Sequence, residues 1–324
     1  MRTEANVVTV TIRDGEAVGR GEGVPYTRYG ETVEGALDAV EGARGLIEAG
    51  GGREELRMAM PAGAARNAVD CALWDLEARL TGRTVAERLG APPPPSSDGF
   101  IPAGAWAAPP APGLIASALT IVIDAPEAMA VAARAVAGAP LIKIKLHADE
   151  PAARIRAVRA AAPGAALIVD PNESWDRAMM EAMRPVLVEA GVALLEQPVP
   201  AVDDAWLEDF GSAVPICADE AIHTRADLDA VSRRYQAVNV KLDKTGGLTE
   251  AIELAREARA RGLGLMTGCM VCSSLSIAPA LHIARMSDFA DLDGPLWLRE
   301  DRAGGVRDEG GLLHPPGRGF WGEP

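Results

Sequence analysis

Short apolar runs alternate with helical segments through most of this 324-residue chain. Each run is rich in aliphatic and β-branched residues and precedes an Ala-, Arg- and Glu-rich stretch, with a repeat of about 22–27 residues. Such alternation predicts parallel strands joined by right-handed crossovers. The runs span 119–123, 141–145, 167–170, 193–196, 215–219, 237–241, 263–267 and 288–292. Eight runs at this spacing favour a closed barrel over an open sheet, so we expect an α/β fold, a (β/α)7β TIM-type barrel.

The residues before this repeat follow a different pattern. Residues 6–12 and 17–22 flank an Asp-Gly pair, which indicates a β-hairpin. Helices are expected at 33–49, 63–81 and 85–89. Four consecutive prolines at 92–95 continue neither a helix nor a central strand, and they indicate a linker. We therefore expect an α+β capping domain over 1–95, the barrel over 96–299, and a Gly- and Pro-rich tail, 300–324, that returns to the cap.

Composition excludes several classes of protein. The net charge is −14 and no basic patch is evident, so we expect no nucleic-acid partner. Acidity of this kind favours solubility and says little about the substrate. No apolar run is long enough to span a bilayer, so we expect no membrane partner. The four cysteines are scattered and the first residues are typical of a strand rather than a signal peptide, so we expect reduced thiols in the cytoplasm.

Three carboxylates close three successive apolar runs: Asp170, Glu196 and Asp219. The carboxyl ends of parallel barrel strands meet at one face, so these side chains are expected to gather there. Carboxylate oxygens are the ligands that Mg²⁺ prefers. For any one of them, an isolated acid at a helix N-terminus is an alternative, because the helix dipole favours negative charge there. Three in consecutive repeats, with lysines on both sides, favour a magnesium site.

Lysines close the runs on either side of these carboxylates. Lys143 and Lys145 end the run before them, and Lys241 ends the run after them. Residues two apart on a strand point the same way, so two neighbouring ammonium groups repel and the pKa of one is lowered. A lysine that is neutral at neutral pH serves as a base. Lysines that face each other across the mouth of the barrel suit removal of a proton from one face of a carbon and its return to the other. For Lys143 and Lys145, the alternative is a pair of solvated surface lysines.

The segments LIKIK, VDPNESW, LLEQP, CADE, VNVKLDKTGG and MTGCM occur in this order along the chain. They resemble the enolase superfamily, in particular its muconate-lactonizing branch, over nearly all of the chain. The resemblance implies one Mg²⁺ per subunit on the three carboxylates, with Lys145 and Lys241 as an acid/base pair. It also implies that Lys143 holds the substrate carboxylate and lowers the pKa of its neighbour.

An Asp-x-Asp pair narrows the resemblance. Asp291 and Asp293 close the last run and resemble the pattern of dipeptide epimerases, in which such a pair binds the free α-ammonium group of the substrate. Two solvent-facing acids beside a strand are the alternative. Other positions that match the substrate pocket of these enzymes are Thr120, Cys269 and Val271.

The loop GVPYTRYGE resembles the cap loop of L-Ala-D/L-Glu epimerases. In that setting Arg28 would bind a side-chain carboxylate of the substrate with two hydrogen bonds. The alternative is an arginine that packs over Tyr26 or Tyr29 or faces solvent. Taken together, the resemblance implies an isomerase, a Mg²⁺-dependent and homo-oligomeric dipeptide epimerase that favours L-Ala-D/L-Glu and recycles murein peptides.

Two features depart from the family pattern. The chain begins at what resembles the second strand of the cap, so the usual first strand is not evident, and Cys272 stands where relatives often carry Glu. Other enzymes of the branch stay open as alternatives, although the Asp291 and Asp293 pair argues against them: an o-succinylbenzoate synthase, a cycloisomerase or an N-acylamino-acid racemase. None of these needs an ammonium clamp. An inactive metal-binding scaffold or a ligand-binding protein is the alternative from a different class, and the missing first strand is the feature that supports it.

Overall fold

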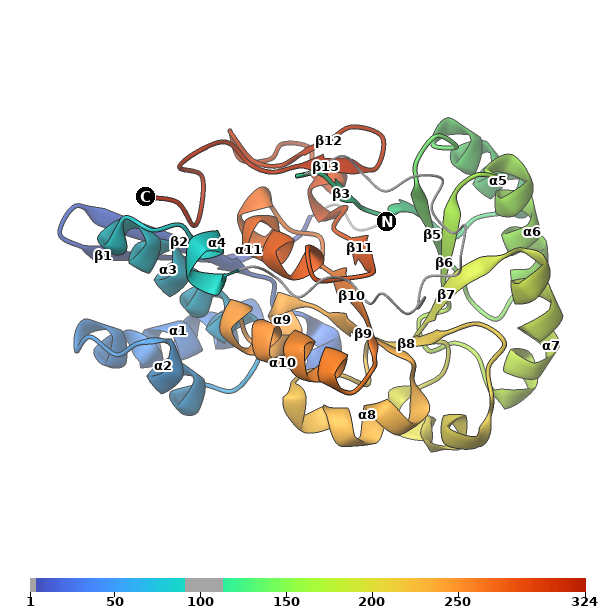
Figure 1. Cartoon of the computed structure of the whole chain (residues 1–324), viewed down its shortest axis with the longest axis horizontal. Helices are drawn as coiled ribbons and strands as arrows, with labels where there is room; N and C mark the ends of the chain where they lie inside the picture. Colours follow the sequence, from blue (N-terminus) through green and yellow to red (C-terminus); the bar gives the residue numbers. More distant parts are fainter. Residues whose placement is uncertain (1–3, 91–112) are drawn as a thin grey trace.

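A parallel barrel forms the body of the molecule. The computed structural model describes residues 4–90 and 113–324, so the four-proline linker and the expected domain boundary after residue 95 lie outside the described residues. Within the described residues, the largest sheet has eight strands in sequence order from β4 to β11 (Figure 1). The strands are β4 Leu119–Ile121, β5 Leu141–Lys145, β6 Ala166–Asp170, β7 Val192–Glu196, β8 Ile216–Ala218, β9 Ala237–Val240, β10 Gly264–Gly268 and β11 Phe289–Asp291. Each lies in one expected run to within a residue, which confirms the fold class.

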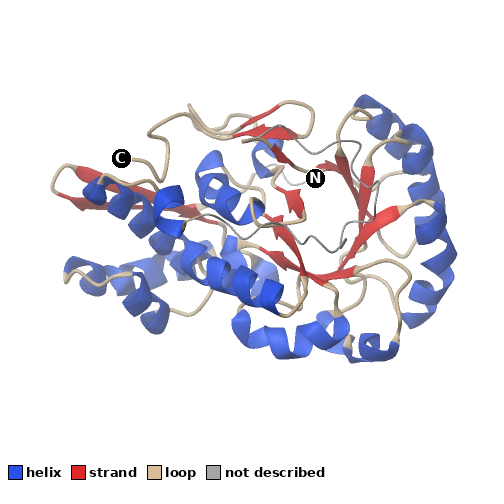
Figure 2. Cartoon of the chain, in the orientation of Figure 1, coloured by secondary structure: helices blue, strands red, loops and turns tan. Residues whose placement is uncertain are grey.

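Helices cover the outside of this sheet (Figure 2). After β7 the chain forms the 3-10 turns η2 (Ala201–Asp203) and η3 (Ala205–Asp209) where the repeat predicted an α-helix. The helices between the other strands are α5 Pro126–Ala135, α6 Pro151–Ala161, α7 Arg177–Glu189, α8 Leu228–Arg234, α9 Leu242–Thr245, α10 Leu248–Ala260 and α11 Ser274–Ala284, with the 3-10 turns η4 Arg225–Asp227 and η5 Gly294–Trp297.

Hydrogen bonds just outside the ladders link the first and last strands. The amide of Ala118 donates to the carbonyl of Ala290 at 2.8 Å, and the amide of Leu292 donates to Ser117 Oγ at 2.8 Å. Both bonds join the start of β4 to the end of β11. The ring of strands is thereby closed, as a barrel requires.

Alternation along each strand separates an apolar floor from a polar mouth. On β5, Ile142 and Ile144 lie in the large apolar cluster that includes residues of the outer helices, whereas Leu141, Lys143 and Lys145 share the opposite side of the strand. The second, smaller cluster consists of Ala118, Leu141, Ala166, Ile168, Ala193, Leu194, Cys217, Ala237, Met266 and Phe289. This cluster is the floor, and the polar residues further along the same strands stand above it.

The N-terminal part forms a small α+β unit beside the barrel (Figure 1). Its antiparallel hairpin pairs β1 (Val8–Asp14) with β2 (Ala17–Gly23), close to the expected strands. Thr32 Oγ1 caps the first helix by accepting from the amide of Gly35, as Ser and Thr caps usually do. The helices are α1 Val33–Glu48, α2 Arg53–Ala59, α3 Ala64–Thr81 and α4 Val85–Leu89, and among them α2 was not expected from the sequence.

Glycines allow β2 to lie directly against α3. A Cβ on Gly19, Gly21 or Gly23 would overlap the carbonyl oxygen of Ala72, Ala68 or Ala64, respectively. The glycines alternate on one face of the strand, and the alanines recur every four residues on one face of the helix. Backbone therefore packs on backbone, and the strand position tolerates no side chain.

We expect Gly21→Val to destabilise the protein strongly. The new side chain must push β2 away from α3, and overpacking of this kind lowers the free energy of unfolding by about 3 kcal/mol. Urea unfolding followed by circular dichroism measures the loss. Gly42→Ala is the matched control, because Gly42 lies inside α1 with open space around a new Cβ and should gain roughly 1 kcal/mol. Equal stabilities for the two variants would contradict the packing argument.

The C-terminal tail contacts both the barrel and the N-terminal unit. Trp321 Nε1 donates to the carbonyls of Arg20 at 2.9 Å and Cys71 at 3.2 Å, and the amide of Gly322 donates to Asp75 Oδ1 at 2.7 Å. Before that, the tail forms a three-stranded sheet from β12 Arg307–Asp308, β13 Leu312–His314 and β3 Ile115–Ala116. Among the described residues, no helix has both the length and the apolar character needed to cross a membrane.

Candidate active site

Five consecutive strands place charged side chains at one face of the barrel. Lys145, Asp170 and Glu196 are the last residues of β5, β6 and β7, while Asp219 and Lys241 follow β8 and β9 directly. Lys145 and Asp170 are partners in the strand register. In an eight-stranded ring, β5 and β9 are four strands apart and therefore lie on opposite walls. The two lysines thus face each other across the mouth, with the carboxylates on the arc between them.

Each carboxylate is paired with an ammonium group. Lys145 Nζ donates to Asp170 Oδ2 at 2.6 Å, and Lys241 Nζ donates to Asp219 Oδ2 at 2.6 Å. Lys143 Nζ lies deeper, 3.0 Å from Asp170 Oδ2 and 2.7 Å from Glu196 Oε2. All three carboxylates are buried. Charge in the mouth is therefore compensated by amines close to every carboxylate.

Burial and neighbouring charge act in opposite directions on these acids. Burial raises the pKa of Glu196, and the charge of Asp170 raises it further. For Asp170, burial also acts upward, but the Lys145 and Lys143 ammonium groups outweigh it and the pKa is lowered. Glu196 Oε2 is buried without a hydrogen-bond partner, because the nearby ammonium of Lys143 lacks hydrogen-bond geometry. Glu196 is thus the acid whose charge is least compensated.

Lys143 differs from the sequence-based expectation of mutual repulsion between lysines. Burial lowers its pKa, but Asp291, Glu196 and Asp170 outweigh burial and hold the pKa well above its usual value. The pKa of Lys241 is raised in the same way, by Asp219 and then Glu196 acting against burial. The carboxylates in the mouth dominate the lysine–lysine repulsion on which the expectation rested.

The donor set fits a hard divalent cation. As the side chains stand, no three His, Cys, Asp or Glu residues among those described converge on one metal position. The reason is that each acid is turned toward an ammonium group. The Lys143 ammonium nevertheless lies between Asp170 and Glu196, where a cation could replace it as the partner of the Glu196 Oε2 that accepts no hydrogen bond. Carboxylate oxygens such as these are the hard ligands that bind Mg²⁺.

Sequence reasoning missed several residues that complete this arrangement. Lys244 Nζ donates to Asp219 Oδ1 at 2.6 Å and to the Asn239 carbonyl at 3.1 Å. Asn239 Nδ2 donates to Glu196 Oε1 at 2.8 Å. The signal for Asn239 was present, because it lies two residues before Lys241 on the same side of β9. Lys244 carried no such signal, since it enters the mouth through the turn of α9.

Two further side chains lie beside Asp219 and were also not expected. Gln197 Oε1 accepts from the amides of Asp219 at 2.8 Å and Ala221 at 3.1 Å. Glu220 is largely buried, and burial followed by the charge of Asp219 raises its pKa to about 7. Gln197 holds the backbone of Asp219, while Glu220 adds a carboxyl group without a hydrogen bond to its Oε2.

Lysine occurs at four positions in the whole chain, and all four belong to this mouth: 143, 145, 241 and 244. The remaining 28 of the 32 Lys and Arg residues are arginines. Arginine stays charged at all physiological pH values, whereas a lysine amine can be tuned by its surroundings. The chain thus uses titratable amines at one place alone.

The Asp-x-Asp pair lies next to the same mouth. Asp291 Oδ2 is 2.8 Å from Lys143 Nζ, and its Oδ1 is buried without a hydrogen-bond partner. Asp293 Oδ2 accepts from the amide of Thr120 at 3.1 Å. Burial, followed by the charge of Asp291, raises the pKa of Asp293 to about 6. The pair therefore presents a desolvated carboxyl surface close to Lys143, and Thr120 takes part through its backbone.

The segment after β10 borders this pair. Cys269 is half-buried and Val271 is 39% exposed, while Cys272 is fully buried with its thiol against that of Cys269. A Cβ on Gly294 would lie 3.0 Å from Cys272 Sγ and 3.1 Å from Cys269 Sγ. Both thiols thus pack beneath the loop that follows Asp293.

Arg28 reaches the barrel from the cap loop. It forms an ion pair with Glu173, which follows β6, and its side chain is 54% exposed. Its neighbour Tyr29 packs edge-on against His223, which follows β8, with ring centroids 4.7 Å apart. The exposed side chain agrees with the solvent-facing alternative to substrate binding, and the ion pair with Glu173 was not expected from the sequence. The cap loop is thereby fixed on both sides of the carboxylate arc.

We expect Gly268→Ala to displace Lys241 and to lower the rate of the reaction at this site, while the barrel stays folded. A Cβ there would lie 2.7 Å from Asn239 Oδ1 and 2.8 Å from Lys241 Cε, so Lys241 must shift. A displacement of about 1 Å costs roughly 100-fold in rate when a positioned group carries the reaction. Steady-state kinetics and thermal unfolding measured together test this. An unchanged rate constant in a folded variant would contradict the placement of Lys241.

The chain is similar to known proteins over nearly its full length. A family model for the mandelate racemase/muconate lactonizing enzyme N-terminal domain matches residues 1–90, and an enolase C-terminal domain-like model matches residues 127–320. The L-Ala-D/L-Glu epimerase of Escherichia coli K12 is 45% identical, over 97% of this chain and 92% of that protein. The N-acetyl-D-glutamate racemase of a Pseudoalteromonas species is 40% identical, over 98% of this chain and 95% of that protein.

A solved structure extends the similarity to three dimensions. It is an enolase family member from Agrobacterium tumefaciens with homology to dipeptide epimerases, described with bound sodium and L-Ala-L-Glu. It is 46% identical with a TM-score of 0.90, and the match covers 99% of this chain and 93% of that one. These matches, together with the arc of carboxylates between opposed lysines, show that the chain belongs to the mandelate racemase/muconate lactonizing enzyme family of the enolase superfamily.

Proposed function

We propose that this chain is a Mg²⁺-dependent dipeptide epimerase, an isomerase that inverts the α-carbon of the C-terminal residue by 1,1-proton transfer. The observation that carries the proposal is the position of Lys145 and Lys241 on opposite walls of the barrel, with three buried carboxylates on the arc between them. A carbon held at the centre of the mouth has one amine on each face. Similarity to an L-Ala-D/L-Glu epimerase over nearly the whole chain supports the same reaction.

Asp170, Glu196 and Asp219 would hold the Mg²⁺, and Lys143 would bind the substrate carboxylate. When bound, Mg²⁺ supplies a Lewis acid beside that carboxylate and takes over charge compensation that the lysines otherwise provide. The sodium ion described for the Agrobacterium protein indicates that a relative accepts a hard cation. Gln197 and Lys244 would orient Asp219, through its amide and its Oδ1 respectively.

Lys145 and Lys241 would act as a pair. One amine, neutral at the start of a turnover, removes the α-proton, while the other, protonated, delivers a proton to the opposite face. Of the two amines, Lys241 is buried, whereas the side chain of Lys145 is 31% exposed, so water is excluded from the Lys241 side of the pair. For the reverse reaction the two lysines exchange roles.

L-Ala-D/L-Glu is the favoured substrate. Asp291 and Asp293 would bind the free α-ammonium group, and Arg28 would bind the side-chain carboxylate of the C-terminal Glu. Both the E. coli and the Agrobacterium proteins are described with this pair of residues in the dipeptide. We further propose that the enzyme recycles murein peptides in the cytoplasm as a homo-oligomer; its four free cysteines suit a reducing compartment.

An N-acylamino-acid racemase is the second candidate, because an N-acetyl-D-glutamate racemase is 40% identical to this chain. An N-acetyl substrate carries no ammonium group, so it gains nothing from two desolvated carboxylates. The Asp291 and Asp293 pair therefore favours a dipeptide with a free amine.

We expect Asp293→Asn to separate the two candidates. Loss of one carboxylate removes a charged hydrogen bond worth about 1.5–3 kcal/mol, so kcat/KM for L-Ala-L-Glu should fall roughly 10- to 100-fold. The value for N-acetyl-L-glutamate should stay the same or rise. Initial rates with both substrates give the comparison, and an equal loss on both would argue for a structural role of Asp293.

Uptake of deuterium from heavy water into a mixed library of dipeptides and N-acetylamino acids, with Mg²⁺ present, tests the proposed function. Mass spectrometry should show one added deuteron in dipeptides with an acidic C-terminal residue. Labelling of N-acetylglutamate alone would favour the second candidate. An absence of label in every compound would favour an inactive metal-binding scaffold and overturn the proposal.

A further inference from the structure

One face of cap helix α3 docks on the segment that follows Lys241. Arg66 Nη2 donates to the carbonyl of Thr245 at 2.6 Å, and Arg66 Nε donates to that of Gly246 at 3.0 Å. Asn67 Nδ2 donates to Asp243 Oδ1 at 2.7 Å. These are buried bonds between residues more than 170 positions apart in the sequence.

The same face continues one turn further along α3. Asp70 Oδ2 accepts from the amide of Thr249 at 3.0 Å, and Asp70 Oδ1 accepts from Thr249 Oγ1 at 2.6 Å. Trp74 Nε1 also donates to Thr249 Oγ1, at 3.0 Å. Positions 67, 70 and 74 are three and four residues apart and therefore share a side of the helix. Contacts with this face thus extend from Asp243 to Thr249.

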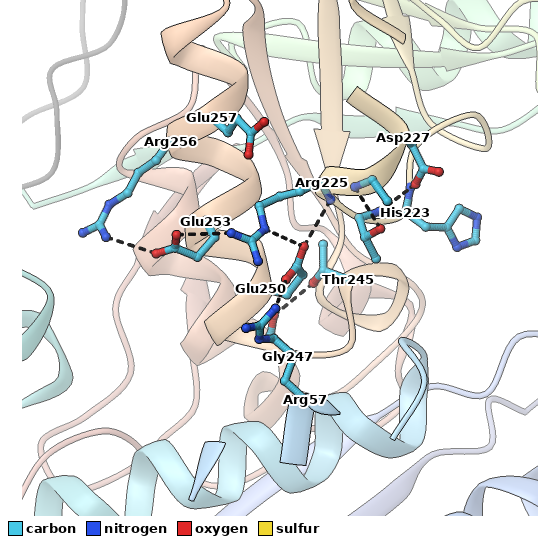
Figure 3. Close-up of polar contacts among 12 residues, drawn as sticks. Arg57, His223, Arg225, Asp227, Thr245, Gly247, Glu250, Glu253, Arg256 and Glu257 are labelled. Atoms are coloured by element: carbon cyan, nitrogen blue, oxygen red, sulfur yellow. Dashed lines mark hydrogen bonds and ion pairs between the residues drawn. The ribbon is translucent and has the colours of Figure 1, made fainter. Parts of the chain in front are cut away.

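The fit at this joint is tight. Gly246 and Gly247 both have positive φ, and a Cβ on either would overlap Arg66 or Asp70. Figure 3 shows Thr245 and Gly247 close to Arg57 and Glu250. A cavity of about 450 Å³ opens beside this contact, lined by Arg57, Arg66, Thr224, Arg225, Ala226, Glu250 and Glu257, none of which belongs to the mouth. The joint is therefore polar and tightly packed on one side and open on the other.

The docked segment in turn fixes Lys241. The amides of Lys244 and Thr245 both donate to the carbonyl of Lys241, each at 3.0 Å. Lys244 also holds Asp219, the carboxylate to which Lys241 Nζ donates. A chain of contacts therefore runs from α3 through residues 242–249 to the backbone and the ammonium group of Lys241.

Lys145 has no comparable support from the cap. Within residues 4–90 and 113–324, no hydrogen bond or ion pair joins the cap to residues 141–150. The cap reaches that wall through the exposed Arg28, which forms an ion pair with Glu173. Glu173 is next to Asn172, whose Oδ1 accepts from Lys145 Nζ at 2.8 Å. One lysine is thus anchored by a buried helix face and the other is not.

We infer that Arg66, Asn67 and Asp70 are positioning residues for Lys241 and not for Lys145, so that the cap sets the geometry of one of the two proton transfers. The inference rests on the proposed function. It requires that weakening the α3 contact slows exchange of the epimer served by Lys241 and spares the epimer served by Lys145.

Exchange of the α-proton in heavy water, followed by ¹H NMR, measures the two transfers separately. The Mg²⁺-loaded protein is mixed with L-Ala-L-Glu or with L-Ala-D-Glu, and the initial rate of exchange is recorded for each. Lys145→Ala and Lys241→Ala first establish which epimer each lysine serves. Arg66→Met should then lower the rate for the Lys241 epimer by about 10-fold or more and change the other by less than about 3-fold.

A matched pair of carboxylates on α3 provides the control. Asp70→Asn should lower the same rate by about 3- to 10-fold. Asp75→Asn removes an equally buried carboxylate whose partners lie in the cap and the tail: the amides of Arg20 and Gly322 and the guanidinium of Arg79. It should leave the ratio of the two rates unchanged. Equal losses on both epimers in Arg66→Met and Asp70→Asn would overturn the inference, since lost metal or lost fold affects both transfers.

Amide hydrogen–deuterium exchange gives a result that does not depend on the reaction. In Arg66→Met and Asp70→Asn, peptides covering 241–249 should exchange faster, while those covering 141–150 should not. Unchanged protection of 241–249 would overturn the inference. If the wild-type protein exchanges neither epimer, the proposed function fails while this measurement still decides whether α3 anchors the segment.

Discussion

Replacing Lys145 or Lys241 with alanine is expected to abolish epimerisation. Each variant lacks the group that removes or delivers the proton on one face, and a positioned acid or base contributes roughly 10³-fold to such a step. The two variants should differ in what they retain. Each should still exchange the α-proton of the epimer served by its remaining lysine, without inversion, and the retained epimers should be opposite.

Polarimetry measures inversion and ¹H NMR in heavy water measures exchange, so the two properties separate. Asp75→Asn serves as a folded control whose altered contacts lie away from the mouth. Full turnover in both lysine variants would remove the basis of the proposed function. Retention of the same epimer by both variants would show that the two amines do not serve opposite faces of the carbon.

Removing Mg²⁺, or replacing its proposed ligand Glu196, is expected to reduce activity to an extent comparable with loss of either lysine. Dialysis against EDTA should stop exchange, and added Mg²⁺ should restore it. Glu196→Gln should weaken Mg²⁺ binding by at least about 100-fold, because loss of a direct ligand costs no less than loss of a supporting contact. Isothermal titration calorimetry measures the affinity without reference to the reaction.

Glu220→Gln is the matched control for the ligand. Glu220 is a neighbouring buried carboxyl group with a partnerless oxygen, like Glu196, but it follows Asp219 and is not assigned to the metal. Its substitution should change the Mg²⁺ affinity by less than about 3-fold. A similar loss of affinity in both variants would place Glu220 in the ligand set, whereas an unchanged affinity in Glu196→Gln would exclude Glu196 from it.

The barrel and the arc of charges followed from two simple rules applied to the sequence. Alternation of strand and helix predicts a parallel barrel, and the last residues of its strands meet at one face. Lys145, Asp170 and Glu196 are indeed the last residues of their strands. Such residues are predictable because a strand has a fixed period of two and a barrel has one catalytic face.

Residues placed by turns and by distant contacts were beyond the reach of these rules. Lys244 enters the mouth because the chain turns into α9 directly after Lys241, and Gln197 supports Asp219 from a backbone with φ of 30°. The short helix α2 carried too weak a periodic signal to be expected. The sign of the pKa shift at Lys143 depends on Asp291, which is 148 residues away along the chain. No local pattern encodes such a distance.

The confinement of lysine to one place has a practical consequence. Apart from the α-amino group, any amine-directed reagent can label this protein only inside its reaction chamber. Reductive methylation with ¹³C-formaldehyde would therefore place side-chain NMR signals only at positions 143, 145, 241 and 244, and the more exposed Lys145 should be labelled before the three buried lysines. Following those signals through a pH titration would show directly which amine gives up its proton first.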